Sequence, residues 1–333
     1  MGAIEPALEG LVLRPYAGEG DVAHTVRVAN AEMAADGIRE HVTVEERLAH
    51  YRHANELFDP RRDVTLAEVD GVVVAYGVRE WVDTTDGVHR EYRIDGSADP
   101  EWRRRGIGAA LLAENIQQAR RLAASHDTGR RKVLGSWSGA TQTGDIALLE
   151  RSGFRQVRWF FEMTRPTLDD IPEVPMPDGI EVREVKAADT KAVWDADVEA
   201  FQDHWGGFDG SEQSMRRFMD SPEFDPSLWV IAFDGEQIAG GVINGIYPEE
   251  NEALGLRRGW LDSVFTRRAW RRRGLARALI ARSLLKLRQR GMSSAVLGVD
   301  ADNPTGALGL YESVGFRVSH RAIAWRRQLD DRG

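Results

Sequence analysis

The chain has 333 residues, of which 42% are hydrophobic and 29% are charged, and its formal net charge is −9. This length predicts roughly two domains, and the acidic balance argues against a protein that coats nucleic acid. The absence of cysteine excludes disulfides and a cysteine nucleophile, and the lack of long apolar runs or a signal pattern leads us to expect a cytoplasmic protein with no membrane partner.

The predicted elements follow the same order in both halves of the chain. A strand and two polar helical stretches precede a pair of strands that meet at Asp-Gly, a dipeptide that suits a tight hairpin. A further strand leads into an Arg/Gly segment and a helix, and a strand, a short helix and a final strand close each half. This order indicates an α/β or α+β sheet with helices packed on it. The strands and helical stretches are expected at 11–14, 21–54, 93–97 and 132–137, and at 180–185, 191–219, 229–233, 238–246, 260–265 and 295–299.

The two halves also share short sequence landmarks at nearly constant spacing. Segment 102–108 (WRRRGIG) matches 270–276 (WRRRGLA) at a separation of 168, and 152–155 (SGFR) echoes 314–317 (VGFR) at 162. This period is far longer than that of solenoid repeats, so each copy is expected to be a whole domain. We therefore predict an N-terminal domain at 1–165 and a C-terminal domain at 178–333, with a proline-rich linker at 166–177.

Each Arg/Gly segment lies between a predicted strand and a predicted helix. Glycine allows close backbone approach to a ligand, and a helix N-terminus offers unpaired N–H groups to phosphate. A lone Arg cluster is more often a solvated basic turn, but two clusters in register favour phosphate binding. The candidate residues are Arg103, Arg104, Arg105, Gly106, Ile107 and Gly108, and Arg271, Arg272, Arg273, Gly274, Leu275 and Ala276.

With these motifs the sequence resembles a tandem member of the GNAT superfamily of acyl-CoA-dependent N-acyltransferases. The resemblance covers nearly the whole chain twice, and includes Asn303, Ala307-Leu308, Leu310-Tyr311 and Gly315-Phe316. It implies two mixed, mostly antiparallel sheets flanked by helices, with acetyl-CoA as the cofactor. The Arg/Gly turns would hold its pyrophosphate, Asn303 would contact the pantetheine or thiol region, and the arm and thioester would lie along Val264, Phe265 and Thr266.

The resemblance further implies that Tyr311 is the general acid that protonates the departing thiolate. Leu149 stands at the equivalent position of the first copy and cannot donate a proton. We therefore expect the N-terminal domain to be non-catalytic or degenerate. The base is expected at Asp262, where an ordinary strand carboxylate is an equally good interpretation.

Four residues are candidates for contact with the acceptor amine. His204 and Trp205 fall in the region that borders the acceptor pocket in the family, although a polar surface His and a core Trp are the simpler interpretations. Glu249 and Glu250 belong to a predicted acidic loop, which is more often solvated than ligand-binding.

The function predicted from these features is acetyl transfer from acetyl-CoA to a primary amine of a small molecule, by direct transfer in a ternary complex. The alternatives are a non-catalytic acyl-CoA sensor, an acetyltransferase acting on a protein amine, and a structural module that binds no CoA. No metal site is expected, because the histidines show no ligand spacing. The oligomeric state is open, and the repeat is compatible with a monomeric pseudo-dimer.

Overall fold

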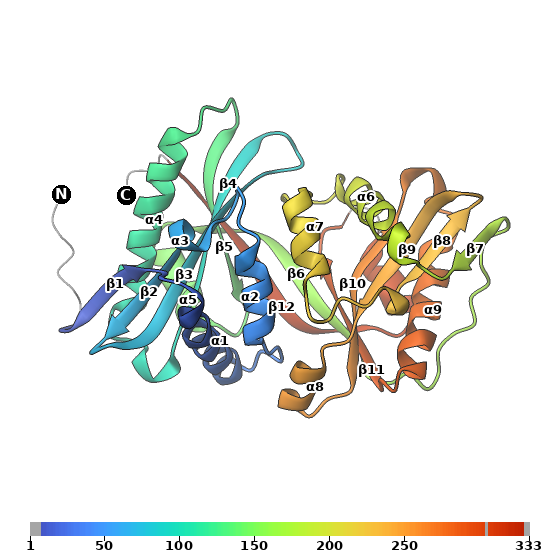
Figure 1. Cartoon of the computed structure of the whole chain (residues 1–333), viewed down its shortest axis with the longest axis horizontal. Helices are drawn as coiled ribbons and strands as arrows, with labels where there is room; N and C mark the ends of the chain where they lie inside the picture. The colour runs from blue at the N-terminus through green and yellow to red at the C-terminus, as the bar shows by residue number, and fades with distance from the viewer. Residues whose placement is uncertain (1–7, 304–305, 330–333) are drawn as a thin grey trace. The chain divides into compact units, whose positions relative to one another are not determined.

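The computed structural model describes residues 8–303 and 306–329, and the chain divides into two compact units (Figure 1). Unit 1 combines the described parts of 1–158 and 322–333 with residues 206–222, and unit 2 combines 159–205 with 223–321. In the described part of the chain no helix has the length and apolar character that crossing a membrane requires.

Unit 1 is built on a mixed sheet in which strands pair in the order β1-β2-β3-β4-β5-β12. The β4–β5 pair is parallel and the other pairs are antiparallel. The strands are β1 (Leu11–Pro15), β2 (Val64–Val69), β3 (Val72–Asp83), β4 (His89–Ala98), β5 (Arg131–Gly139) and residues 322–328 of β12 (Arg317–Gln328).

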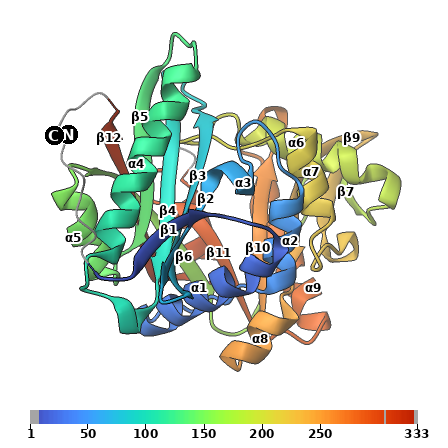
Figure 2. The same ribbon diagram turned by 60° about the vertical axis from the view of Figure 1, so that its left-hand side comes forward.

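Helices cover both faces of this sheet because strand residues alternate between its two sides, and a β-bulge opposite Ala67 and Glu68 places Val74 and Ala75 on the same side. On one face Val73 and Tyr76 pack with the first helices, and on the other Val74 and Ala75 pack with Ile107 of α4. Figure 2 shows α4 lying along the strands. The helices of unit 1 are α1 (Val22–Asp36), α2 (Val44–Arg52), α3 (Pro60–Asp63), α4 (Ile107–Ser125), α5 (Thr143–Arg151) and α7 (Glu212–Met219).

Unit 2 repeats this plan with strands in the order β7-β8-β9-β10-β11-β6. The β10–β11 pair is parallel and the others are antiparallel. The strands are β7 (Ile180–Arg183), β8 (Val230–Asp234), β9 (Gln237–Gly245), β10 (Arg258–Thr266), β11 (Ser294–Asp300) and residues 159–165 of β6 (Arg155–Arg165), and the helices are α6 (Thr190–Phe201), α8 (Pro248–Leu254), α9 (Leu275–Gln289) and α10 (Ala307–Ser313). The predicted fold class, mixed and mostly antiparallel sheets flanked by helices, is confirmed.

The final strands are exchanged between the copies, which the sequence did not predict. The last strand of the chain, β12, pairs with β5 of unit 1, and β6 pairs with β11 of unit 2. Backbone hydrogen bonds specify a strand only weakly, so two similar strands can each complete either sheet. Residues 206–222, expected among the helices of the second copy, also belong to unit 1. The domain boundaries at 165 and 178 stay a prediction.

Two local expectations have different outcomes. The Asp-Gly hairpin is present between β2 and β3, where Asp70 and Gly71 both have positive φ (51° and 81°) as a type I′ turn requires. The acidic loop expected around Glu249 is instead helix α8. Its Pro248 at the first position, acidic first turn and left-handed Gly255 (φ 63°) after the last turn are strong helix-end signals.

Candidate active site

The Arg/Gly turns of the two copies have the same backbone conformation. Arg104 and Arg272 have φ values of 63° and 62°, and Gly106 and Gly274 have values of 84° and 82°. Helices α4 and α9 begin at the next residue without a side-chain cap, so their first N–H groups remain available to an anion. The space around Gly274 is open, because a Cβ there would meet no atom within 4 Å.

The first arginine of each turn holds the turn in place. Arg271 donates to Asp203 (2.8 Å) and to the carbonyl of Thr266 (3.0 Å). In the other copy Arg103 donates to both carboxylate oxygens of Asp36 at 2.7 Å. These two arginines therefore brace the turns rather than extend toward a phosphate.

The remaining residues of the turns are exposed arginines, followed by the first residues of the helices, which are buried or half-buried. Arg104, Arg105, Arg272 and Arg273 are exposed. Arg105 lies over the ring of Trp102 (4.7 Å), and Arg273 donates to the carbonyl of Asp178 (3.4 Å). Ile107 and Leu275 begin the helices with buried side chains, and Gly108 and Ala276 follow them, half-buried.

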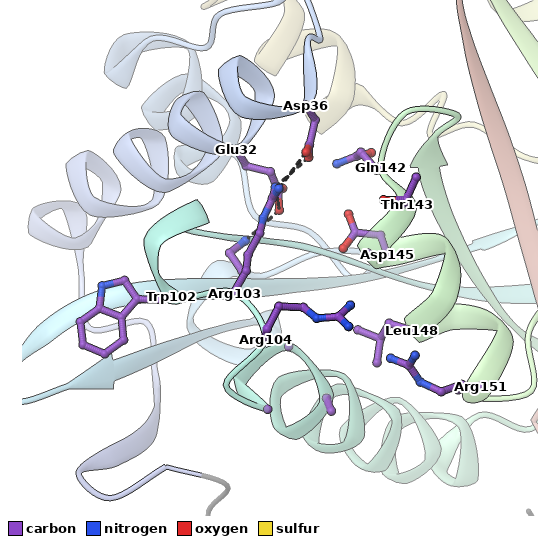
Figure 3. A pocket seen from close by; sticks show the side chains of 15 residues that line it. Glu32, Asp36, Trp102, Arg103, Arg104, Gln142, Thr143, Asp145, Leu148 and Arg151 are labelled. Atoms are coloured by element: carbon purple, nitrogen blue, oxygen red, sulfur yellow. Dashed lines mark hydrogen bonds and ion pairs between the residues drawn. The ribbon is translucent and has the colours of Figure 1, made fainter.

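A pocket of about 320 Å³ lies at the turn of unit 1 (Figure 3). Glu32 and Asp36 reach into it from α1, and Asp145 and Leu148 from α5. Burial, together with the neighbouring carboxyl of Asp145, raises the pKa of Glu32 to about 7. Burial also raises the pKa of Asp145. The pocket is thus lined by carboxyl groups of both helices together with the guanidinium groups of Arg104 and Arg151, so its walls carry charges of both signs.

In unit 1, carboxylates also occupy backbone donors near the ends of β4 and β5. The pairing between these strands runs from His89↔Arg131 to Arg93↔Gly135. Beyond it, the N–H of Ala98 donates to Glu32 (3.1 Å), and the N–H of Trp137 donates to Asp95 (2.9 Å). Two donors that could hold an extended ligand between the strands are thus already satisfied.

The corresponding strands of unit 2 leave more room for a ligand. Pairing between β10 and β11 runs from Arg258↔Ser294 to Trp260↔Val296, so Val264, Phe265 and Thr266 lie beyond it and pair with β9. Phe265 is buried, whereas Val264 is half-buried. The hydroxyl of Thr266 is buried and has no hydrogen-bond partner among the described residues. An unsatisfied buried hydroxyl fits a strand that contacts a polar ligand.

Asp262 occupies a β-bulge in β10. The register with β9 shifts between Leu261 and Ser263, which leaves Asp262 as the extra residue. Although Asp262 is accessible to solvent, the surrounding protein excludes enough water to raise its pKa to about 7. The hydroxyl of Tyr247 donates to its Oδ1 (3.2 Å). A carboxyl with this pKa can accept a proton near neutral pH.

Tyr311 lies on α10 with 7% of its surface exposed. Its ring meets that of Phe316 edge-on at 6.2 Å, so it contributes to the core as well. Burial raises the pKa of Tyr311 to about 12, and the phenol therefore stays protonated and able to donate at neutral pH. In unit 1 the equivalent Leu149 on α5 is buried.

Asn303 and the predicted acceptor residues lie in turns and helix ends of unit 2. The backbone N–H of Asn303 donates to the carbonyl of Asp300 (3.1 Å) in the turn after β11. His204 stacks on Phe201 (4.1 Å), and burial lowers its pKa, which favours the neutral imidazole. Trp205 lies 5.9 Å from the ring of Phe160.

The two glutamates of α8 have different environments. Glu249 is exposed. Glu250 is buried, and its two oxygens accept from Arg258 (2.5 Å) and from the indole N–H of Trp260 (2.9 Å). Glu250 is thus positioned to hold α8 against β10, whereas the side chain of Glu249 is open to solvent.

Two residues near Asp262 had no signal in the sequence. The contact of Tyr247 with Asp262 depends on a β-bulge that has no sequence signature. Asp197 on α6 accepts from the hydroxyl of Ser263 (2.6 Å), and burial raises its pKa to about 6. Spacing along the chain cannot bring together residues from separate elements.

Comparison with known proteins places this geometry in context. The model of the "Acetyltransferase (GNAT) family" matches residues 30–154 and 191–316. A protein of Geodermatophilus obscurus named "Mycothiol acetyltransferase" is 29% identical over 92% of this chain and 94% of its own. A protein of Salinispora tropica with the same name is 30% identical over 89% of each chain.

Solved structures have the same architecture over the full chain. A GCN5-related N-acetyltransferase from Sphaerobacter thermophilus superposes with a TM-score of 0.71, 26% identity, and coverage of 97% of this chain and 96% of that one. A tandem GNAT protein from the clavulanic acid biosynthesis pathway gives a TM-score of 0.68 with 18% identity, over 97% of this chain and 100% of that one. The latter likeness concerns the fold alone.

Proposed function

This chain belongs to the acetyltransferase (GNAT) family, and we propose that its C-terminal copy transfers an acetyl group from acetyl-CoA directly to a primary amine of a small molecule. The observation that carries the assignment is an asymmetry between the copies. Unit 2 combines the bulged Asp262 with the protonated Tyr311. Unit 1 has Leu149 in place of the acid and a β3–β4 ladder in continuous register from Asp83↔Arg90 to Ala75↔Ala98.

A small amine acceptor is supported by the relatives and by charge. The relatives from Geodermatophilus obscurus and Salinispora tropica carry the name "Mycothiol acetyltransferase", which is that of an enzyme acting on a small molecule. Asp262 is influenced by the carboxylates of Glu223 and Glu250, which raise its pKa. Such a negative region attracts an ammonium group.

Acetyl-CoA fits unit 2 through main-chain and hydroxyl groups. The first N–H groups of α9 would hold the pyrophosphate, with Arg272 and Arg273 adding positive charge beside them. Val264, Phe265 and Thr266 would lie along the pantetheine arm, with the hydroxyl of Thr266 as a polar partner. Asn303 would contact the thiol end. The bound substrate supplies the thioester that the amine attacks.

The chemistry expected of the side chains is proton transfer. Asp262 takes a proton from the ammonium group, so that the neutral amine can form the new C–N bond. Backbone N–H groups stabilise the negative charge that develops on the carbonyl oxygen. As the C–S bond breaks, Tyr311 donates its proton to the sulfur and regains one from the new amide nitrogen. The proton held by Asp262 returns to solvent.

The N-terminal copy has a different role in this proposal. Glu32 and Asp95 satisfy the backbone N–H groups of Ala98 and Trp137, and Leu149 cannot act as an acid. We assign this copy a structural role, with little or no turnover of its own.

Tyr311→Phe tests the assignment. The variant should lose about 10²- to 10⁴-fold in kcat because the thiolate must leave unprotonated, as measured by thiol release from acetyl-CoA with a panel of amines. Tyr92→Phe, which removes a phenol bonded to His126 in unit 1, should retain full activity. Binding of CoA without release for any amine would favour the sensor, and activity carried by unit 1 would show as undiminished turnover in Tyr311→Phe.

A further inference from the structure

The carboxyl group of Asp262 lies beside the last residue of β9, Gly245, and beside Tyr247, which follows that strand. Its Oδ1 accepts from the hydroxyl of Tyr247 at 3.2 Å. A Cβ added to Gly245 would lie 2.4 Å from Oδ2 and 2.8 Å from Cε2 of the Tyr247 ring. One oxygen is thus oriented by a hydrogen bond, and the other has room only because position 245 lacks a side chain.

Tyr247 is itself firmly placed. It is the residue before α8, whose first position is Pro248. Its ring meets the indole of Trp260 edge-on at 6.2 Å. Trp260 in turn donates to Glu250 of α8, which also pairs with Arg258. The phenol is therefore fixed by the same contacts that attach α8 to β10.

The equivalent residues of the N-terminal copy make no such arrangement. At the offset of 164 residues that aligns the hairpins, Trp81 and Asp83 stand in the places of Gly245 and Tyr247. In β4, Asp95 accepts from the backbone N–H of Trp137 instead. Gly245, Tyr247 and the bulged Asp262 occur together in the copy to which we assign catalysis.

We propose that Tyr247 is a positioning residue for the base, holding the Asp262 carboxylate in the orientation that receives the proton of the acceptor amine, with Gly245 providing the space. This inference rests on the proposed function of unit 2. It concerns the same reaction and adds a residue that neither the motif nor the family match assigns.

The charged groups around Asp262 determine the sign of the expected effect. Exclusion of water by the surrounding protein raises the pKa of Asp262, the carboxylates of Glu250 and Glu223 also raise it, and the hydrogen bond from Tyr247 lowers it. Asp197 is bonded to Ser263 and Arg258 to Glu250. Removal of the Tyr247 hydroxyl should therefore raise the pKa of Asp262 and leave less carboxylate at neutral pH.

The first experiment is the pH profile of kcat/KM for the amine in Tyr247→Phe, which keeps the ring against Trp260. The acid limb of the profile should move to higher pH. On the acid side of this limb kcat/KM should be about tenfold lower than in the wild type, and at high pH it should equal the wild-type value. KM for acetyl-CoA should stay unchanged. Gly245→Ala should instead lower kcat at every pH, because it displaces the carboxylate. Tyr92→Phe, the matched loss of a phenol in unit 1, should leave the limb where it is.

A second measurement does not require turnover. The carboxyl carbon of Asp262, followed by ¹³C NMR in the full-length protein, should titrate at higher pH in Tyr247→Phe than in the wild type. An unchanged titration and an unchanged limb would overturn the role of Tyr247 while leaving the acetyltransferase assignment intact. Full activity of Asp262→Asn, or no transfer to any amine by the wild type, would overturn both the base and its positioning residue.

Discussion

At the scale of single residues, the sequence indicated which side chains could transfer protons more readily than which neighbours each side chain contacts. The resemblance implied Tyr311 as the acid and gave Asp262 as either the base or an ordinary strand carboxylate; the structure adds the burial of Tyr311 and a raised pKa for both groups. Sequence alone treated Glu249 and Glu250 as equals in one acidic loop. They differ because α8 turns Glu250 toward Arg258 and leaves Glu249 in water. Which neighbour a side chain meets depends on contacts between elements, which spacing does not encode.

This difference gives a prediction for the adjacent glutamates. Glu250→Ala should lower the free energy of unfolding by about 3–5 kcal/mol, because it leaves Arg258 buried without its carboxylate. Glu249→Ala, the matched exposed control, should change it by less than about 0.5 kcal/mol. Urea unfolding measures both. Equal, small effects in the two variants would show that the Arg258 pair does not hold α8.

At the scale of elements, the repeat predicted most strands and helices, but it predicted neither the β-bulge at Asp262 nor the exchange of β6 and β12. The hairpin turns and the Arg/Gly turns are local, so Asp70-Gly71 and Gly274 specify them through positive φ. The bulge at Asp262 adds one residue without a signature. β6 and β12 follow similar segments, 152–155 and 314–317, so the sequence does not indicate which of the two strands pairs with β5 and which with β11.

The exchange predicts that a residue near the end of the chain stabilises unit 1. Trp325 of β12 is buried and donates to the hydroxyl of Ser138 on β5 (2.9 Å). Trp325→Ala should cost about 3–5 kcal/mol, and hydrogen exchange should show the loss of protection in β5. Val318→Ala, an exposed position of the same strand within unit 2, is the control. Loss of protection confined to β11 would contradict the pairing.

At the scale of the whole molecule, two copies of one fold have unequal sites. Both retain a helix N-terminus after a left-handed glycine. The residues that give the second copy an acid and a bulged base are absent at the equivalent positions of the first, where Glu32 and Asp95 accept from the backbone N–H groups of Ala98 and Trp137. The fold is thus present twice, and acetyl transfer is expected only in the second copy.

A matched pair of substitutions tests this asymmetry. Gly274→Glu and Gly106→Glu both replace a glycine with φ near 80° at the start of a helix, so their backbone strain is comparable. Gly274→Glu should raise KM for acetyl-CoA at least about tenfold, since a carboxylate repels the pyrophosphate. Gly106→Glu should leave turnover unchanged. Steady-state kinetics measure both effects, with thermal unfolding as a check on folding, and the opposite ranking would move catalysis to unit 1.

The strand exchange also has a consequence for synthesis on the ribosome. The side of β5 that faces away from β4 receives its partner, β12, roughly 180 residues later in the chain. At translation rates of about 5–20 residues per second, that edge waits roughly 10 to 40 seconds for its partner. An unpaired edge is a template for aggregation, so the nascent first half should depend on chaperones, or on transient pairing with β6, until the last strand emerges.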